Sequence, residues 1–155
     1  MTDTRKNLIY NISIYYLDNR FYVVGLVRMP PIGIRTQVHP VYTVIGDDKE
    51  ELAKTIEAAR LESSPDLPIK QINALRTPWD GNKKKVWNNA SKSWEISWYE
   101  DGSVEISSHE SYDPNDPDLE EGKAWRGIKD GKKLLSSPVS SQDIAKEIMN
   151  QAMLK

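Results

Sequence analysis

The chain has 155 residues, 38% of them hydrophobic, with five tryptophans, seven tyrosines, no cysteine and a formal net charge of −2. This length and composition predict one folded domain over residues 1–155 and argue against a disordered chain. The absence of cysteine excludes disulfides and thiolate metal sites. No apolar stretch reaches the roughly 20 residues needed to cross a bilayer, so we expect a cytoplasmic protein that does not engage a membrane.

The first strong pattern is a pair of β-rich runs in LIYNISIYYLDNRFYVVGLVRM. It predicts a hairpin of strands 9–17 and 21–28, because Asp18-Asn19 tolerates the positive φ of a two-residue turn. This loop length sets the register, with the facing pairs Tyr16 and Phe21, Ile14 and Val23, Ile12 and Gly25, and Tyr10 and Val27. One side of the hairpin is then almost wholly apolar and is expected to face the core.

The next segments change character twice. MPPIGIRTQVHP is bounded by prolines and is expected to form a loop or a sheet edge, and VYTVIG a short strand. In GDDKEELAKTIEAARLESS the apolar residues recur at helical spacing, and Asp47 or Asp48 can cap the first turn, which predicts a helix at 48–62. The C-terminal SSQDIAKEIMNQAMLK has a serine cap and the same spacing, which predicts a second helix at 142–154.

A second hairpin, 93–99 with 103–109, is predicted from SWEISWY and SVEISS. A two-residue loop would place Trp98 opposite Glu105 and scatter the apolar residues. A three-residue loop with Gly102 in the left-handed conformation keeps them together, with the facing pairs Trp98 and Val104, Ile96 and Ile106, and Trp94 and Ser108. These elements predict an α+β fold, a mainly antiparallel sheet of hairpins with two packed helices.

Charge is concentrated in one part of the chain. From Glu100 to Glu121 there are nine acidic residues and neither lysine nor arginine. Residues 1–99 carry 14 basic and 11 acidic side chains, and residues 122–155 carry seven basic and three acidic ones. The small net charge therefore conceals a negative block that is offset elsewhere.

The register of the second hairpin turns alternate residues away from the apolar side. That face would present Glu95, Ser97, Tyr99, Glu105, Ser107 and His109, with Glu100 and Asp101 at the turn and the acidic loop YDPNDPDLEE beside it. Two interpretations stay open: a solvated surface kept for solubility, or a docking surface that steers a basic partner. On the second interpretation the partner-binding residues are Glu95, Tyr99, Glu100, Asp101, Glu105, His109, Glu110, Tyr112, Asp113, Asp116 and Asp118.

Residues that could carry a reaction are scarce. His39 and His109 are the only histidines, and the sequence has no H-x-x-x-H pair, G-x-S-x-G or phosphate-binding glycine loop. His109 with Glu110 and Asp113 could form an acid/base or metal group, which leaves a hydrolase as a further alternative. DPNDPDLEE is dense in oxygen ligands but lacks the spacing and glycine of an EF-hand. We expect neither an enzyme nor a metal or cofactor site.

A small, acidic, cysteine-free α+β domain with a segregated negative face and the hairpin SWEISWYEDGSVEIS resembles bacterial toxin immunity proteins, in particular those of contact-dependent growth inhibition. The resemblance implies that the chain binds one cognate toxin domain, commonly a nuclease, and blocks its active site or substrate surface. An acidic face would suit a basic partner that cleaves nucleic acid.

The alternative is a nucleic-acid or small-ligand binding module that uses KKKVW, with Lys83, Lys84, Lys85 and Trp87. Because the chain is acidic overall, we expect no direct binding to nucleic acid.

Overall fold

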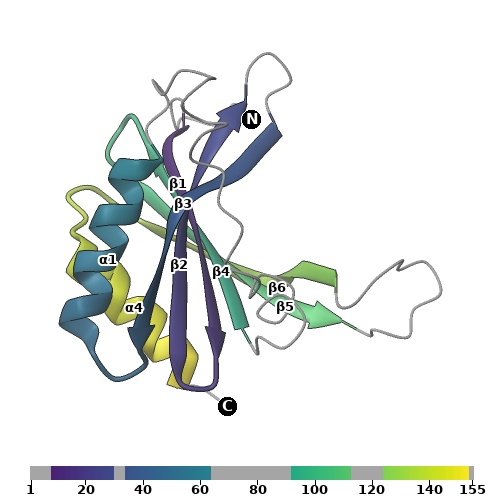
Figure 1. Ribbon diagram of the computed structural model, residues 1–155. Helices are drawn as coiled ribbons and strands as arrows, with labels where there is room; N and C mark the ends of the chain where they lie inside the picture. Colours follow the sequence, from purple (N-terminus) through teal and green to yellow (C-terminus); the bar gives the residue numbers. More distant parts are fainter. Residues whose placement is uncertain (1–7, 30–33, 64–91, 113–123, 154–155) are drawn as a thin grey trace.

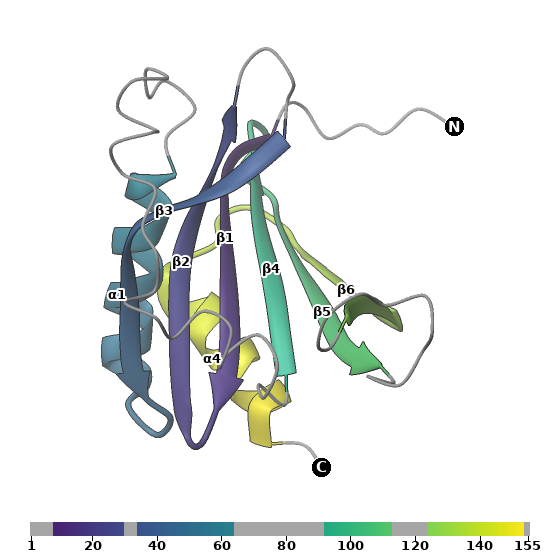
Figure 2. The same ribbon diagram turned by 45° about the vertical axis from the view of Figure 1, so that its right-hand side comes forward.

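The computed structural model describes residues 8–29, 34–63, 92–112 and 124–153. The elements in these ranges are β1 (Leu8–Leu17), β2 (Arg20–Met29), β3 (Ile34–Ile45), α1 (Lys49–Glu62), β4 (Lys92–Tyr99), β5 (Val104–Tyr112), β6 (Ala124–Leu135) and α4 (Ser141–Met153). The strands form one antiparallel sheet in the order β3-β2-β1-β4-β5-β6. Both helices lie on the same face of this sheet (Figure 1; Figure 2). The predicted α+β fold with an antiparallel sheet and two helices is confirmed.

The first hairpin has the predicted turn and register. Asp18 and Asn19 both have positive φ, 50° and 61°, as the twist of a two-residue hairpin turn requires. The paired residues include Tyr16 with Phe21, Ile14 with Val23, and Ile12 with Gly25. The pairing ends at Asn11 and Leu26, one pair short of the predicted Tyr10 and Val27.

The second hairpin also has the predicted register, with Trp98 opposite Val104, Ile96 opposite Ile106, and Trp94 opposite Ser108. Gly102 has a φ of 86°, the left-handed conformation expected of it. The turn chemistry and the apolar alternation therefore agree on one register, because a slip of one residue would send the apolar side chains to the other face.

The two edge strands differ from expectation. β3 pairs with β2 from Ile34 onward, where a proline-bounded loop or edge and a short strand were expected. Its pairing steps from Val38 to Val41 at an irregularity, and Pro40 falls in that step, where its missing N–H interrupts no regular ladder. β6 was not predicted, because AWRGIKDGKKLL contains two glycines and five charged residues without alternation. At an edge, with one neighbouring strand, such a sequence can still pair.

The helices begin and end within one residue of the predicted bounds. Asp48 caps α1 by accepting a hydrogen bond from the backbone N–H of Glu51 at 3.0 Å. Neither helix in the described ranges is long and apolar enough to cross a bilayer.

The hydrophobic core lies between the helices and the sheet. Its buried residues are Ile12, Ile14, Phe21, Val23, Val44, Leu52, Ala53, Ile56, Ala59, Trp94, Ile96, Val104, Ile106, Ile144, Ala145 and Ile148. The apolar sides of both hairpins thus meet the apolar faces of α1 and α4, and burial of this surface is the main force that holds the layers together.

Candidate partner-binding site

The residues predicted to bind a partner divide between a turn and a sheet face. Glu100 and Asp101 are exposed in the β4–β5 turn. Glu95, Glu105 and His109 lie on the sheet face opposite the helices and are only partly exposed, as is Tyr99 at the end of β4.

Side chains at the centre of that sheet face are buried. Ser97 and Ser107, which the sequence placed on an exposed surface, are 8% and 9% exposed. Tyr15 and Val24 share this face and are 5% and 0% exposed. In addition, Glu95, Tyr99 and Glu105 each already have an interaction partner. Of the predicted residues whose side-chain burial the structure describes, only Glu100 and Asp101 in the turn are exposed.

The other predicted residues lie either in β5 or outside the described residues. Glu110 and Tyr112 lie in β5, at positions paired with Arg126 and Ala124. Asp113, Asp116 and Asp118 lie outside the described residues, as do Lys83, Lys84, Lys85 and Trp87.

The histidines lie within strands. His39 is in β3, and His109 is in β5, where it pairs with Ser93 of β4 and Gly127 of β6. Within the described ranges, no three histidine, aspartate or glutamate side chains are grouped so that they could hold a metal ion. Asp113, the third member of the group considered with His109, is not among those residues.

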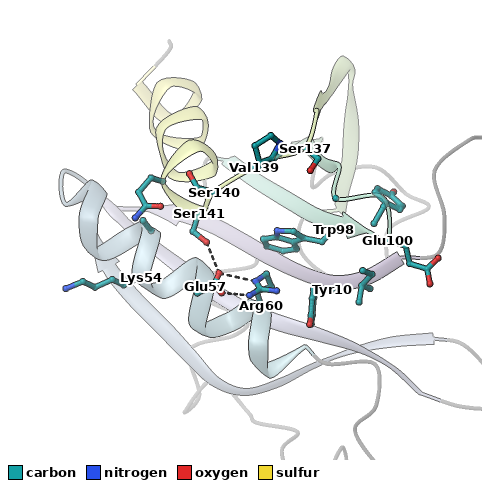
Figure 3. A pocket seen from close by; sticks show the side chains of 16 residues that line it. Tyr10, Lys54, Glu57, Arg60, Trp98, Glu100, Ser137, Val139, Ser140 and Ser141 are labelled. Carbon is teal, nitrogen blue, oxygen red and sulfur yellow. Dashed lines mark hydrogen bonds and ion pairs between the residues drawn. The ribbon is translucent and has the colours of Figure 1, made fainter.

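A groove that was not predicted opens next to the acidic turn, on the helical face of the sheet (Figure 3). Its volume is about 850 Å³, and it is bounded by α1, by the β4–β5 turn and by residues 137–142, which lead into α4. The side chains that define it are Tyr10, Glu57, Arg60, Trp98, Val139 and Ser141. Tryptophan, tyrosine and arginine are the residue types that most often dominate the energetics of protein interfaces.

A polar network crosses this groove and links three elements. The Glu57 carboxylate of α1 accepts hydrogen bonds from Arg60 Nε at 3.0 Å, from Arg60 Nη2, and from Ser141 Oγ of α4 at 3.0 Å. The Arg60 guanidinium lies 4.6 Å from the ring centroid of Tyr10 in β1, a cation–π arrangement. The network fixes the position of the Arg60 side chain, which lines the groove.

The pKa values of the pair agree with this geometry. The hydrogen bond from Arg60 lowers the pKa of Glu57, although partial burial opposes the change. The same hydrogen bond raises the pKa of Arg60. Both groups are therefore charged at neutral pH. Because the pair is partly exposed, it contributes little to stability and serves mainly to orient the two side chains.

The turn that forms one wall of the groove is tightly held. Asp101 Oδ1 accepts hydrogen bonds from the backbone N–H and the hydroxyl of Ser103, at 2.9 and 2.5 Å. A Cβ atom on Gly102 would lie 2.6 Å from Ser137 Oγ, so the turn is in close contact with the segment that precedes α4. Glu100 is thus presented on a fixed backbone.

The groove could not be read from the sequence, because Tyr10, Glu57, Trp98 and Ser141 are far apart along the chain. The one local signal was the pair Glu57 and Arg60, whose spacing of three residues on a helix favours an ion pair. Nothing in the sequence indicates that Tyr10 and Ser141 contact that pair.

No family model matches the chain, and no curated protein matches it in sequence. Its structure is similar to that of a protein of unknown function from Neisseria meningitidis, with a TM-score of 0.62 and 20% identity over 99% of this chain and 98% of that one. It is also similar to a chain of the CdiA-CT/CdiI toxin and immunity complex from Yersinia pseudotuberculosis, with a TM-score of 0.59 and 11% identity over 96% of this chain and 100% of that one. At these identities the comparisons show a shared fold.

Proposed function

We propose that this chain is an immunity protein that binds a cognate toxin domain and neutralises it. The observation that carries the proposal is the fold shared, almost end to end, with a chain of a complex that contains a toxin and an immunity protein. A toxin needs reacting groups, whereas an inhibitor needs only a complementary surface. His109 pairs with Ser93 and Gly127 in the sheet, and in this proposal it has no catalytic role.

We propose further that the toxin domain is basic, as an enzyme that cleaves nucleic acid would be. The negative block from Glu100 to Glu121 would then attract it and raise the rate of encounter. Glu100 and Asp101, which are exposed, would make direct contacts, while the partly buried Glu95 and Glu105 would add to the negative field. In this proposal the chain acts in the cytoplasm by binding alone, without metal, cofactor or catalysis.

The rigidity of the turn supports a role in binding. A partner that meets a preformed surface loses less free energy to the ordering of loops and side chains than one that meets a mobile surface. The hydrogen bonds within the turn and its contact with Ser137 provide such a surface.

We propose that the toxin domain is encoded beside this chain's gene, and the test produces that domain in a bacterial host with and without the chain. We expect the chain to restore growth and to form a stable complex with the purified domain. Unchanged toxicity and no complex by calorimetry would reject the proposal.

A salt titration with nonspecific RNA and DNA tests the alternative function. Binding through phosphate contacts weakens steeply as salt rises. We expect no binding at physiological salt, and tight binding with a steep salt dependence would instead favour a nucleic-acid module.

A further inference from the structure

The two ends of the groove carry opposite charges that the groove itself does not neutralise. Lys54 of α1 and Glu100 of the β4–β5 turn both line it and are both exposed. Figure 3 places them at opposite ends, with Arg60 and Trp98 between them. Neither side chain is in an ion pair with another described residue. A ligand that lies along the groove therefore meets a positive group at one end and a negative group at the other.

The charged side chains in the middle of the groove are already paired with each other. Glu57 and Arg60 neutralise each other there, and the face of Tyr10 already carries the Arg60 guanidinium. Trp98 and Val139 are partly buried against the core, so each leaves some apolar surface open to the groove. This region is suited to an apolar side chain, whose burial against an aromatic ring contributes free energy without the desolvation of another charge.

We infer that the groove binds a surface segment of the toxin domain in which an acidic, an apolar and a basic residue follow one another, and that it does so in one direction only. The acidic residue would face Lys54, the apolar residue would cover Trp98, and the basic residue would face Glu100. A volume of about 850 Å³ falls within the roughly 300–1,000 Å³ typical of ligand pockets and leaves room for several side chains. The inference rests on the proposed function and adds how the toxin domain is oriented.

Direction matters because a reversed segment would bring like charges together at both ends. Juxtaposed like charges are a common means by which an interface rejects incorrect partners. The groove would thus discriminate by the order of charges along the segment, whereas the acidic block as a whole responds only to the net charge of the partner.

The test compares the full-length wild-type chain with Lys54→Glu, Glu100→Lys and the double variant that carries both changes. Each single variant changes the net charge by two units, whereas the double variant keeps the wild-type net charge and inverts the polarity of the groove. Both positions are exposed, so folding is expected to be unaffected, which thermal unfolding verifies. The probe is the toxin domain encoded beside this chain's gene, and its affinity is measured at low and at physiological salt.

We expect each single variant to weaken binding about tenfold, and the double variant to weaken it most, by roughly a hundredfold if the two ends act independently. A matched control exchanges charges outside the groove, with Lys146→Glu and Asp47→Lys combined, both at exposed positions. This control is expected to change the affinity by less than about threefold, since exposed charges remote from an interface contribute little at physiological salt.

The possible outcomes distinguish a failure of the inference from a failure of the proposed function. If the double variant binds as the wild type does, net charge and not polarity governs binding, and the inference is wrong. If all variants bind equally, the groove is not used, although wild-type binding would still support an immunity protein. If the wild-type chain does not bind the toxin domain, the proposed function itself fails.

Discussion

Replacing Gln151 with methionine is expected to destabilise the protein by removing hydrogen bonds that link α4 to the sheet. Gln151 lies in the last turns of α4, and its Oε1 accepts hydrogen bonds from Trp94 Nε1 of β4 at 2.8 Å and from Ser108 Oγ of β5 at 2.5 Å. Methionine has a similar length and flexibility but no strong acceptor. The substitution therefore removes both hydrogen bonds, together with the one that Gln151 Nε2 donates to the partly exposed Glu147 Oε2 at 3.0 Å, while it preserves most of the packing.

The size of the effect follows from the burial of the two donors. Trp94 is 1% exposed, so its indole N–H loses its acceptor where water has little access, at a cost of about 1–3 kcal/mol. Ser108 is 8% exposed and loses one hydrogen bond, at a cost of about 1 kcal/mol. Together we expect a loss of about 2–4 kcal/mol, a large part of the 5–15 kcal/mol typical of a folded domain.

Urea denaturation followed by far-ultraviolet circular dichroism measures this loss. We expect the midpoint to fall with an unchanged slope, because the surface exposed on unfolding stays the same. Gln142→Met, at an exposed position in the same helix, is the matched control and is expected to change stability by less than about 0.5 kcal/mol. A loss below about 0.5 kcal/mol for Gln151→Met would refute the reasoning, because Trp94 and Ser108 would then have other acceptors.

Three further outcomes are expected. Gly102→Ala should cost about 1–3 kcal/mol in chemical denaturation, because its φ of 86° disfavours a side chain and its Cβ would press on Ser137 Oγ; an unchanged midpoint would contradict this. Asp48→Ala should cost about 1 kcal/mol through loss of the α1 cap, and Asp48→Asn should recover most of it. Stability should fall as the pH drops below 4.5, the ordinary pKa of glutamate, because hydrogen bonds from Arg60 and Lys133 lower the pKa values of Glu57 and Glu147. A carboxyl group whose pKa is lower in the folded state than in the unfolded state stabilises the folded state fully at pH values above the unfolded pKa. That contribution is lost as the pH falls through the folded pKa. Denaturation curves at pH 6 and pH 3 therefore test the sign of the effect.

Local sequence was sufficient for the elements in which turn chemistry and apolar periodicity agree. Asp18-Asn19 and Gly102 each permit a backbone conformation that is strained for most residues, and with the apolar alternation each leaves one workable register. The helices were predictable because caps and helical spacing are local features. Local sequence was insufficient to predict β6, which is rich in glycine and charged residues. This segment forms a strand by pairing with β5 at the edge of the sheet.

The candidate site depended on tertiary structure for a different reason. Sequence alternation correctly separated the two faces of the β4–β5 hairpin, but it carries no information on what covers each face. It therefore placed Ser97 and Ser107 on an accessible surface, whereas both are buried. The groove arises where α1, the segment before α4 and the β4–β5 turn meet, and its network joins Tyr10, Arg60 and Ser141 across long stretches of chain. Contacts of this kind depend on how the two layers are placed against each other, and that placement follows from packing of the whole core and not from any local pattern.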